Sequence, residues 1–328
     1  MATASKVLNG RSDVSPATRA RVQKLLLEHD YTGRPAKTDT KDTVELIVAG
    51  VSNYAMEVMQ GVLNEARSAD VDVVVSSYST EGRPIRSGRS TPWIRELTVG
   101  SRRAVIGVNV RLSDADLAIL ARARLPVVLI DPIDIPHVDI TSVGSTNFAG
   151  GLAATRHLLS LGHRKIAYIG GPATANCSQA RTQGFRGAME AAGLPVPDSY
   201  VKMRDFYYED GLIGGAALLD LPERPTAIFA GCDQLAVGVI EAARVRGLRV
   251  PEDLSVVGFD DTELARLSSP PLTTVRQPLR EMGAVAVRTA MRLASGEKID
   301  SHHVELATSL VVRSSAVALS GVAAPSAT

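Results

Sequence analysis

Cysteine is scarce in this chain of 328 residues, and long apolar runs are absent. The two cysteines, Cys177 and Cys232, cannot build a disulfide scaffold and do not have the spacing of metal ligands. No apolar run approaches the ~18 residues that a membrane-spanning helix needs. The first residues also lack the apolar core of a secretory signal. We therefore exclude an integral membrane protein and expect a protein of the reducing cytoplasm.

The motifs of several enzyme classes are missing as well. The sequence contains no G-x-S-x-G, H-E-x-x-H or G-x-x-x-x-G-K-[ST] pattern, and no G-x-G-x-x-G after an apolar run. Asp260 and Asp261 are adjacent, but neighbouring side chains at a strand end point to opposite sides and do not share a substrate. His157 and His163 are six residues apart, which is not a metal spacing on one helix face. We expect no catalytic activity, no bound metal and no cofactor.

What is present is an ordinary globular composition with an uneven charge distribution. Apolar residues make up 45% of the chain and charged residues 22%, which provides a sizeable core. The length suggests about two domains on a scale of roughly 150 residues each. Residues 1–41 carry a net charge of +4 and the remaining residues a net charge of −3. A basic head on a near-neutral body indicates a polyanion-binding element, and the alternative is a solvated tail with coincidental charges.

Short apolar runs alternate with amphipathic stretches from residue 44 onward. The runs are rich in β-branched residues and end at Gly, Asn, Asp or Ser, which is typical of strands buried on both faces. They cover residues 44–51, 71–77, 104–110, 126–131, 165–171, 226–231 and 254–260. Helical patterns at 55–69, 113–124, 149–162 and 233–247 lie between them. The alternation predicts an α/β fold with two doubly wound parallel sheets, preceded by a small helical head.

The domain boundaries follow from this pattern. Ser15-Pro16 has the form of a helix start, with Ser as the N-cap and Pro in the first turn. The polar stretch after the head reads as a linker, and the small residues at the end of the chain predict disorder. We expect a head at 1–31, a linker at 32–43, a first subdomain at 44–161 plus 276–303, a second at 162–275 plus 304–314, and a disordered tail at 315–328.

Polar and aromatic side chains follow several of the predicted strands. In open parallel sheets, ligands bind beyond the carboxyl ends of the strands, so these side chains predict a pocket. Arg and carboxylate groups can hold pairs of hydroxyls, and an aromatic face can cover the C–H side of a sugar ring. The alternative is that each Asp or Asn merely caps a helix or closes a turn, which holds equally well for any single position. The predicted set is Asn53, Tyr54, Asp131, Arg181, Phe206, Cys232, Asp233 and Asp260.

Several motifs, in one order along the chain, resemble the LacI/GalR family of bacterial transcription repressors. They are TASKVLNGRSDVSPATRARVQKL at 3–25, NFAGGLAATRHLLSLGHRKIAYIGG at 147–171, RTQGFRGAMEAAG at 181–193, GCDQLAVG at 231–238, VPEDLSVVGFDD at 250–261 and PPLTTVRQP at 270–278. The resemblance implies a helix-turn-helix head and a core like that of periplasmic sugar-binding proteins. It also implies a homodimer on a pseudo-palindromic operator, with a small effector, usually a sugar or nucleobase, between two subdomains.

The resemblance also implies residue roles. Arg181, Phe206 and Asp260 match the family's effector-contacting Arg, aromatic and Asp. Cys232 replaces an Asn that often contacts sugar hydroxyls, and a thiol is a weaker hydrogen-bonding group. In the head, the segment 1–9 resembles the recognition helix, with base-edge or phosphate contacts predicted. The predicted DNA-contacting residues are Met1, Ala2, Thr3, Ser5, Lys6, Asn9, Ser15 and Thr18.

Two departures from the family pattern bear on DNA binding. Family members usually begin some fifteen residues earlier, so this chain starts inside the second helix of the motif. We expect either a start further upstream or impaired DNA binding, because so small a head has little core to lose. The family's R-A-x-x-L hinge helix is also absent, so a leucine wedge in the minor groove is not assumed.

The sequence therefore predicts a DNA-binding transcriptional regulator, a repressor released or engaged by a small sugar. The first alternative is a cytosolic sugar-binding protein that does not bind DNA. A periplasmic sugar receptor is disfavoured by the missing secretion signal and the basic head. An enzyme on a doubly wound scaffold is disfavoured by the missing catalytic motifs.

Overall fold

The computed structural model describes residues 15–28, 41–78, 97, 102–133 and 140–319. Residues 1–41 form one unit and residues 42–328 a second. In the first unit the described element is helix α2 (Pro16–Glu28). The Ser15 hydroxyl accepts a hydrogen bond from the Thr18 amide at 3.3 Å and lies 2.8 Å from the Thr18 hydroxyl. The predicted helix start at Ser15-Pro16 is therefore confirmed.

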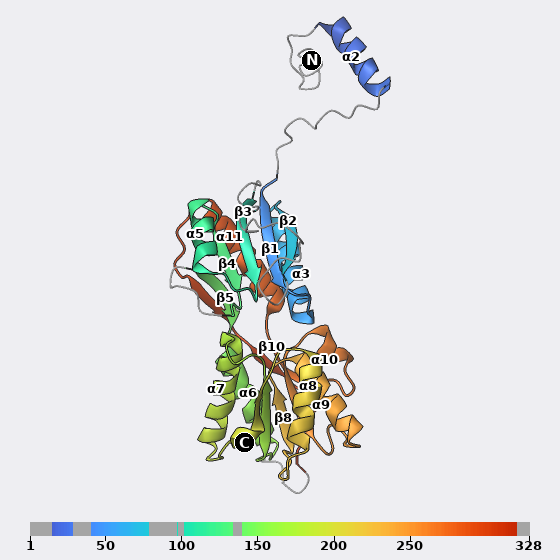
Figure 1. Ribbon diagram of the computed structural model, residues 1–328, viewed down its shortest axis with the longest axis vertical. Helices are drawn as coiled ribbons and strands as arrows, with labels where there is room; N and C mark the ends of the chain where they lie inside the picture. Colours follow the sequence, from blue (N-terminus) through green and yellow to red (C-terminus); the bar gives the residue numbers. More distant parts are fainter. Residues whose placement is uncertain (1–14, 29–40, 79–96, 98–101, 134–139, 320–328) are drawn as a thin grey trace, which may run out of the picture. The chain divides into compact units, whose positions relative to one another are not determined.

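The second unit contains two six-stranded sheets with helices on both faces of each (Figure 1). The first sheet has the strand order β11-β5-β4-β3-β1-β2, and all its neighbouring strands are parallel. Its strands are β1 (Thr43–Ala49), β2 (Asp72–Tyr78), β3 (Arg102–Val108), β4 (Val127–Ile130), β5 (Thr141–Ser145) and β11 (His303–Leu306). Its helices are α3 (Asn53–Ser68), α5 (Asp114–Arg122) and α11 (Leu279–Ala294).

The second sheet has the order β12-β10-β9-β8-β6-β7, and only β12 runs antiparallel to its neighbour. Its strands are β6 (Ile166–Gly170), β7 (Val201–Met203), β8 (Ala227–Ala230), β9 (Ser255–Asp260), β10 (Thr273–Arg276) and β12 (Ser309–Val311). Its helices are α6 (Asn147–Ser160), α7 (Asn176–Ala191), α8 (Tyr208–Leu219), α9 (Asp233–Val245), the short α10 (Glu263–Leu267) and the 3-10 turn η1 (Asp198–Tyr200).

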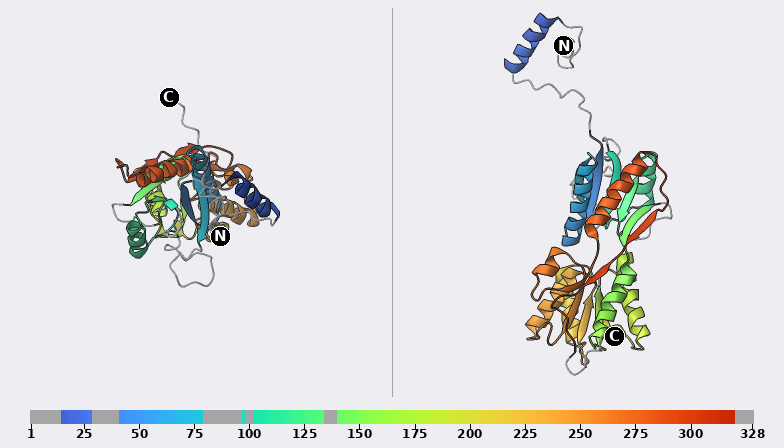
Figure 2. Two further views of the ribbon diagram at one scale, coloured as in Figure 1. Left: turned by 90° about the horizontal axis from the view of Figure 1, so that it is seen from above. Right: turned by 180° about the vertical axis from the view of Figure 1, so that it is seen from behind.

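Burial on both faces explains why the central strands read as apolar runs. Every residue of β6, β8 and β9 is buried. Helices α3 and α11 pack together on one face of the first sheet, and the view from behind in Figure 2 shows α11 in orange across that face. Helices α8 and α9 cover one face of the second sheet, and α6 and α7 cover the other. The predicted α/β class with two doubly wound sheets is confirmed.

The chain passes between the two sheets three times. We define the first lobe as residues 43–145 and 279–306, and the second lobe as residues 147–276 and 309–319. The three crossovers that connect the lobes are residues 145–147, which include the last residue of β5 and the first of α6, and residues 277–278 and 307–308. All three pass beside one another at the junction of the lobes, because hydrogen bonds join the first crossover to each of the others.

Two predicted boundaries differ from this arrangement. The sequence placed the end of the first segment at residue 161, but α6 packs against α7 on the second sheet, so the passage is at Thr146. An amphipathic stretch does not reveal which of two sheets its apolar face covers. The last passage was predicted at 303/304, but β11 pairs with β5 in the first sheet through Leu306.

The predicted disordered tail is wrong for residues 315–319. Ser315 is fully buried, and its hydroxyl donates to the Val256 carbonyl at 2.6 Å and accepts from the Thr273 amide at 2.8 Å. The Val317 amide donates to the Ser255 hydroxyl at 3.1 Å, and the Leu319 amide to the Leu161 carbonyl at 2.9 Å. Small residues without a hydrophobic period therefore extend the second lobe through backbone pairing. Residues 320–328, like the linker 32–40, lie outside the described residues.

Candidate functional site

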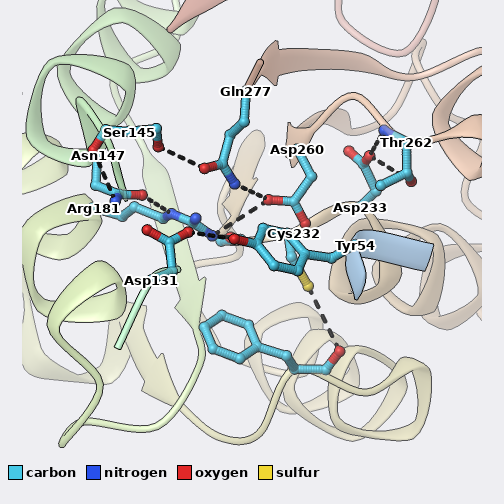
Figure 3. Close-up of polar contacts among 12 residues, drawn as sticks. Tyr54, Asp131, Ser145, Asn147, Arg181, Cys232, Asp233, Asp260, Thr262 and Gln277 are labelled. Carbon is cyan, nitrogen blue, oxygen red and sulfur yellow. Dashed lines mark hydrogen bonds and ion pairs between the residues drawn. The ribbon is translucent and has the colours of Figure 1, made fainter. Parts of the chain in front are cut away.

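Four of the predicted side chains meet at the junction of the two lobes (Figure 3). Tyr54 and Asp131 belong to the first lobe, and Arg181 and Asp260 to the second. Three of them follow strand ends: Tyr54 lies in the first turn of α3 after β1, Asp131 follows β4, and Asp260 ends β9. The fourth, Arg181, lies on α7 after β6. This is the edge at which parallel sheets bind ligands.

The first-lobe pair is joined directly. The Tyr54 hydroxyl donates a hydrogen bond to Asp131 Oδ2 at 2.7 Å. Ser52 positions this tyrosine, because its hydroxyl accepts from the Ala55 amide at 3.2 Å and so starts α3 immediately after β1. This bond uses Asp131 Oδ2, so Oδ1 is not engaged by Tyr54. Both side chains face the second lobe (Figure 3). Tyr54 and Asp131 therefore present one acceptor-rich wall to Arg181 and Asp260.

Arg181 is held by several groups of the second lobe. Its Nε donates to Asn147 Oδ1 at 2.8 Å and its Nη1 to the Gly231 carbonyl at 2.6 Å. Its guanidinium lies over the Phe259 aromatic ring, with Cζ 3.8 Å from the centroid. Gly151 of α6 allows this placement, because a Cβ there would collide with the Arg181 backbone. The arginine is thus a fixed, buried cation.

Asp260 is the acidic counterpart of Arg181. Its Oδ1 lies 3.6 Å from Arg181 Nη1 and accepts a hydrogen bond from Gln277 Nε2 at 2.6 Å. Gln277 Oε1 in turn accepts from the Ser145 hydroxyl at 2.5 Å. The ion pair of the site is therefore tied to the first and second crossovers.

Burial dominates the electrostatics of the cluster. It raises the pKa of Asp260 to about 7, although Arg181 and the Gln277 amide both oppose the rise. Burial also raises the pKa of Asp131, against the hydrogen bond from Tyr54 and the charge of Arg181. The pKa of Tyr54 rises well above 10.0, through burial and then the neighbouring Asp131 carboxylate. The site therefore favours ligands that donate hydrogen bonds and do not add negative charge.

The backbone at both carboxylates is unusual. Asp131 has a φ of +43° and Asp260 a φ of +109°, in the left-handed region that L residues rarely adopt. Such conformations cost on the order of 1–3 kcal/mol each and persist where the surroundings impose them. Strain at both carboxylates of one cluster is typical of a functional site.

The other predicted site residues lie around this cluster with different partners. Asp233 is fully engaged, because its carboxylate accepts from the Thr262 amide and hydroxyl and from the Thr274 hydroxyl. The Cys232 sulfur caps α9 by accepting from the Leu235 amide at 3.4 Å, and it lies 3.7 Å from the Phe206 carbonyl. Asp233 and Cys232 therefore support the local fold.

Phe206 and Asn53 lie at two sides of the site. The Phe206 aromatic ring packs on Gly171, where a Cβ would overlap it. Asn53 lines a cavity of about 430 Å³ beside the cluster, together with Glu57, Glu263 and other residues of α3 and α10. An adjoining cavity of about 340 Å³ has Gln277 in its wall. The two cavities share Glu57, Arg266 and Arg280 in their walls, so they adjoin between α3 of the first lobe and α10 of the second.

The lobes also touch through the backbone. The Asn176 amide, in the first turn of α7, donates to the Ile133 carbonyl of the first lobe at 3.1 Å. Arg181, Asp260 and Asp131 are 3%, 6% and 8% exposed, whereas Tyr54 is partly exposed, so three of the four side chains are closed to solvent. A ligand that contacts all four side chains therefore requires the lobes to separate.

Three residues of the site were not predicted: Ser145, Asn147 and Gln277. Gln277 follows β10, a short Thr-rich strand without an apolar run, so the search of strand ends passed over it. Ser145 was passed over for the same reason, because it ends β5, which also has no apolar run. The signal that was available is the motif PPLTTVRQP at 270–278, which contains Gln277.

The predicted DNA-contacting residues Met1, Ala2, Thr3, Ser5, Lys6 and Asn9 lie outside the described residues. Ser15 and Thr18 start α2. Within the described residues no group of three His, Cys, Asp or Glu side chains is arranged as metal ligands would be. In the same part of the chain, no helix combines the length and apolarity needed to cross a bilayer.

Comparison with known proteins agrees with this fold. A periplasmic binding protein-like domain matches residues 155–316. The HTH-type transcriptional regulator DegA of Bacillus subtilis (strain 168) is 36% identical, over 95% of this chain and 93% of the relative. A transcriptional regulator CelR–cellobiose complex is 30% identical with a TM-score of 0.74, covering 95% of this chain and 94% of that one. A lac repressor dimer bound to operator and the anti-inducer ONPF is 26% identical with a TM-score of 0.73, covering 97% and 95%.

Proposed function

The chain belongs to the LacI family of transcriptional regulators, and from this premise we propose that a sugar bound at the lobe junction controls its binding to operator DNA. The observation that carries the proposal is the convergence of Tyr54 and Asp131 from one lobe with Arg181 and Asp260 from the other. A ligand placed between them contacts both lobes at once. Its binding energy then favours one arrangement of the lobes over another.

The chemistry of the four side chains matches a polyol. The Asp131 and Asp260 carboxylates accept hydrogen bonds from hydroxyls, and the Arg181 guanidinium donates to ring or hydroxyl oxygens. Phe206 and Tyr54 supply aromatic surface for the C–H face of a sugar. We assign effector contacts to these five residues, with Asn53 at the margin, and structural support to Cys232 and Asp233.

DNA binding is proposed for the head. Residues 1–41 carry a net charge of +4, which favours contact with phosphates. The lac repressor neighbour is a dimer on its operator. We infer that this chain likewise acts as a homodimer on a two-fold operator in the cytoplasm. Met1, Ala2, Thr3, Ser5, Lys6, Asn9, Ser15 and Thr18 are the proposed contacts.

A thermal-shift screen of the full chain against neutral mono- and disaccharides, cellobiose included, tests the effector. A bound sugar raises the unfolding midpoint by mass action, and calorimetry then gives its affinity. Arg181→Gln should abolish this shift, because it removes the buried cation of the site. Arg186→Gln on the same helix is the matched control, because the Arg186 side chain is 40% exposed and lies 3.9 Å from Asp198. A sugar that binds Arg181→Gln as tightly as the wild type would contradict the proposed site.

A further inference from the structure

Four hydrogen bonds, closed into a ring by the Arg181–Asp260 ion pair, link the site to the crossovers (Figure 3). Arg181 donates to the Asn147 side chain, whose Nδ2 donates to the Ser145 carbonyl at 3.0 Å. The Ser145 hydroxyl donates to Gln277, Gln277 donates to Asp260, and Asp260 faces Arg181 again. We call these five residues, Arg181, Asn147, Ser145, Gln277 and Asp260, the crossover circuit.

Every member of the circuit is removed from water. Ser145, Arg181 and Gln277 are 0%, 3% and 4% exposed, and the other two members are also buried. A buried polar group that loses its partner costs about 1–3 kcal/mol, so the circuit breaks only at a cost. We therefore expect the hydrogen bonds of the circuit to persist as long as the two lobes keep this arrangement.

The orientation of the Gln277 amide is dictated by its neighbours. When Asp260 is ionised its carboxylate only accepts hydrogen bonds, so the NH₂ group of Gln277 faces it. Its oxygen must then face Ser145, so the Ser145 hydroxyl is the donor. The Gln277 backbone amide also donates to the Asp260 carbonyl at 3.2 Å. Gln277 thus follows any movement of Asp260 with both its backbone and its side chain.

We propose that Gln277 is a positioning residue that couples the Arg181–Asp260 pair to the crossovers and thereby holds the two lobes closed. This inference deepens the proposed function, because an effector that engages Asp260 or Arg181 competes for bonds of the circuit. Freed from Asp260, the Gln277 amide no longer fixes Ser145, and the first and second crossovers can move relative to each other. Binding of an effector at the site thereby allows the two lobes to move relative to each other at these two crossovers.

The third crossover provides a matched control. The Thr308 amide donates to the Thr146 hydroxyl at 3.0 Å, and the two hydroxyls are also 3.0 Å apart. Thr308 therefore ties two crossovers together, as Gln277 does, but it makes no bond to Arg181, Gln277 or Asp260 among those described. Thr308→Val removes the contacts of the Thr308 hydroxyl and keeps its amide bond, so it tests whether loss of any side-chain bond between crossovers has the same effect.

The Asn176 amide provides a local reporter of closure. Its hydrogen-bond partner is the Ile133 carbonyl of the other lobe, and its place in the first turn of α7 gives it no acceptor within the helix. Exchange of this amide with deuterium therefore follows separation of the lobes. Amides of β8, inside the second sheet, exchange only when that lobe unfolds.

The test is amide exchange of the full chain without any ligand, as wild type, Gln277→Leu, Ser145→Ala and Thr308→Val. We expect exchange at Asn176 to rise on the order of tenfold in Gln277→Leu and by a smaller factor in Ser145→Ala, which keeps the Gln277–Asp260 bond. Thr308→Val should leave the exchange rate of the Asn176 amide within about twofold of the wild-type rate. If Gln277→Leu does not fold, the smaller rise expected for Ser145→Ala provides the test.

Three results would overturn the inference. The first is unchanged exchange at Asn176 in both circuit variants. The second is an equal rise in exchange at Asn176 and in β8, and the third is an equal rise at Asn176 in Thr308→Val, since either shows general loosening. Because no sugar is added, a failed sugar screen does not affect this measurement, and a failed exchange test does not affect the sugar screen.

Discussion

The guanidinium of Arg181 stacks on the aromatic ring of Phe259, whose centroid lies 3.8 Å from Cζ. Phe259 is followed directly by Asp260, so consecutive residues of β9 supply an aromatic face and a carboxylate to one arginine. Stability of the second lobe and geometry of the site are therefore connected at this point.

We expect Phe259→Leu to lower the free energy of unfolding by about 1–3 kcal/mol, through the lost cation–π contact and the cavity left behind. Urea unfolding of the variant and the wild type measures this change in the free energy of unfolding. Phe148→Leu is the control, because Phe148 is 50% exposed and should change stability by less than about 0.5 kcal/mol. Equal effects of the two substitutions would contradict the role of the stacked pair.

The raised pKa of Asp260, about 7, makes stability depend on pH. In the unfolded chain the carboxyl releases its proton near pH 4, whereas in the folded protein it keeps it until about pH 7. Stability contributed by this group is therefore lost as the pH rises from about 4 to 7. Asp260→Asn should show a smaller loss of stability than wild type when unfolding at pH 5 is compared with pH 8. Parallel curves for the two proteins would argue against burial of the charged carboxylate.

The Cys232 sulfur occupies the N-cap position of α9, where Ser is a better acceptor for the Leu235 amide. Cys232→Ser should therefore match or exceed the wild-type unfolding midpoint. Cys232→Ala should lose about 0.5–2 kcal/mol, because the amide then has no side-chain cap. Neither change should alter sugar affinity more than about threefold. A large loss of affinity in Cys232→Ser would instead give the thiol a direct ligand contact.

The acidic groups of the site predict discrimination against anions. Burial raises the pKa of both Asp131 and Asp260, which shows that this site already disfavours negative charge, and a buried phosphate would add to that cost. For a sugar found in the screen, we expect its phosphate ester to bind at least about tenfold more weakly by calorimetry. Asp131→Asn should reduce the difference in affinity between the sugar and its phosphate ester. A sugar phosphate that binds more tightly than its parent would refute this expectation while leaving the site in place.

Lys6 is expected to contribute to base readout by the head. Lys6→Ala should weaken binding by about 1–3 kcal/mol to a duplex that the wild-type chain selects from a random pool, as measured by gel shift. Lys202→Ala on β7 is the control. Identical affinities for Lys6→Ala and wild type would move the readout to other residues of the head.

The sequence predicted the core strands well, because burial on both faces leaves continuous β-branched runs such as those of β1 and β9. Strands β5 and β10 escaped prediction, since their Thr and Ser side chains carry no apolar period. At the site, Tyr54, Asp131, Arg181 and Asp260 were found from strand ends and family motifs. Asp233 also follows a predicted strand, yet its two carboxylate oxygens accept hydrogen bonds from Thr262 and Thr274. Only three-dimensional pairing distinguishes these cases and gives a role to Gln277, which the motif at 270–278 contains.

The pairing of residues 315–319 with β9 and Leu161 has a practical consequence for protein engineering. A truncation after residue 314 would leave the Thr273 and Val256 amides without Ser315 and would remove the Val317 carbonyl that His163 contacts at 3.0 Å. Affinity tags, fluorescent fusions and biosensor linkers should therefore be joined beyond Leu319. A join nearer the core would damage the lobe that carries Arg181, and such a sensor would lose its response for reasons unrelated to its sugar.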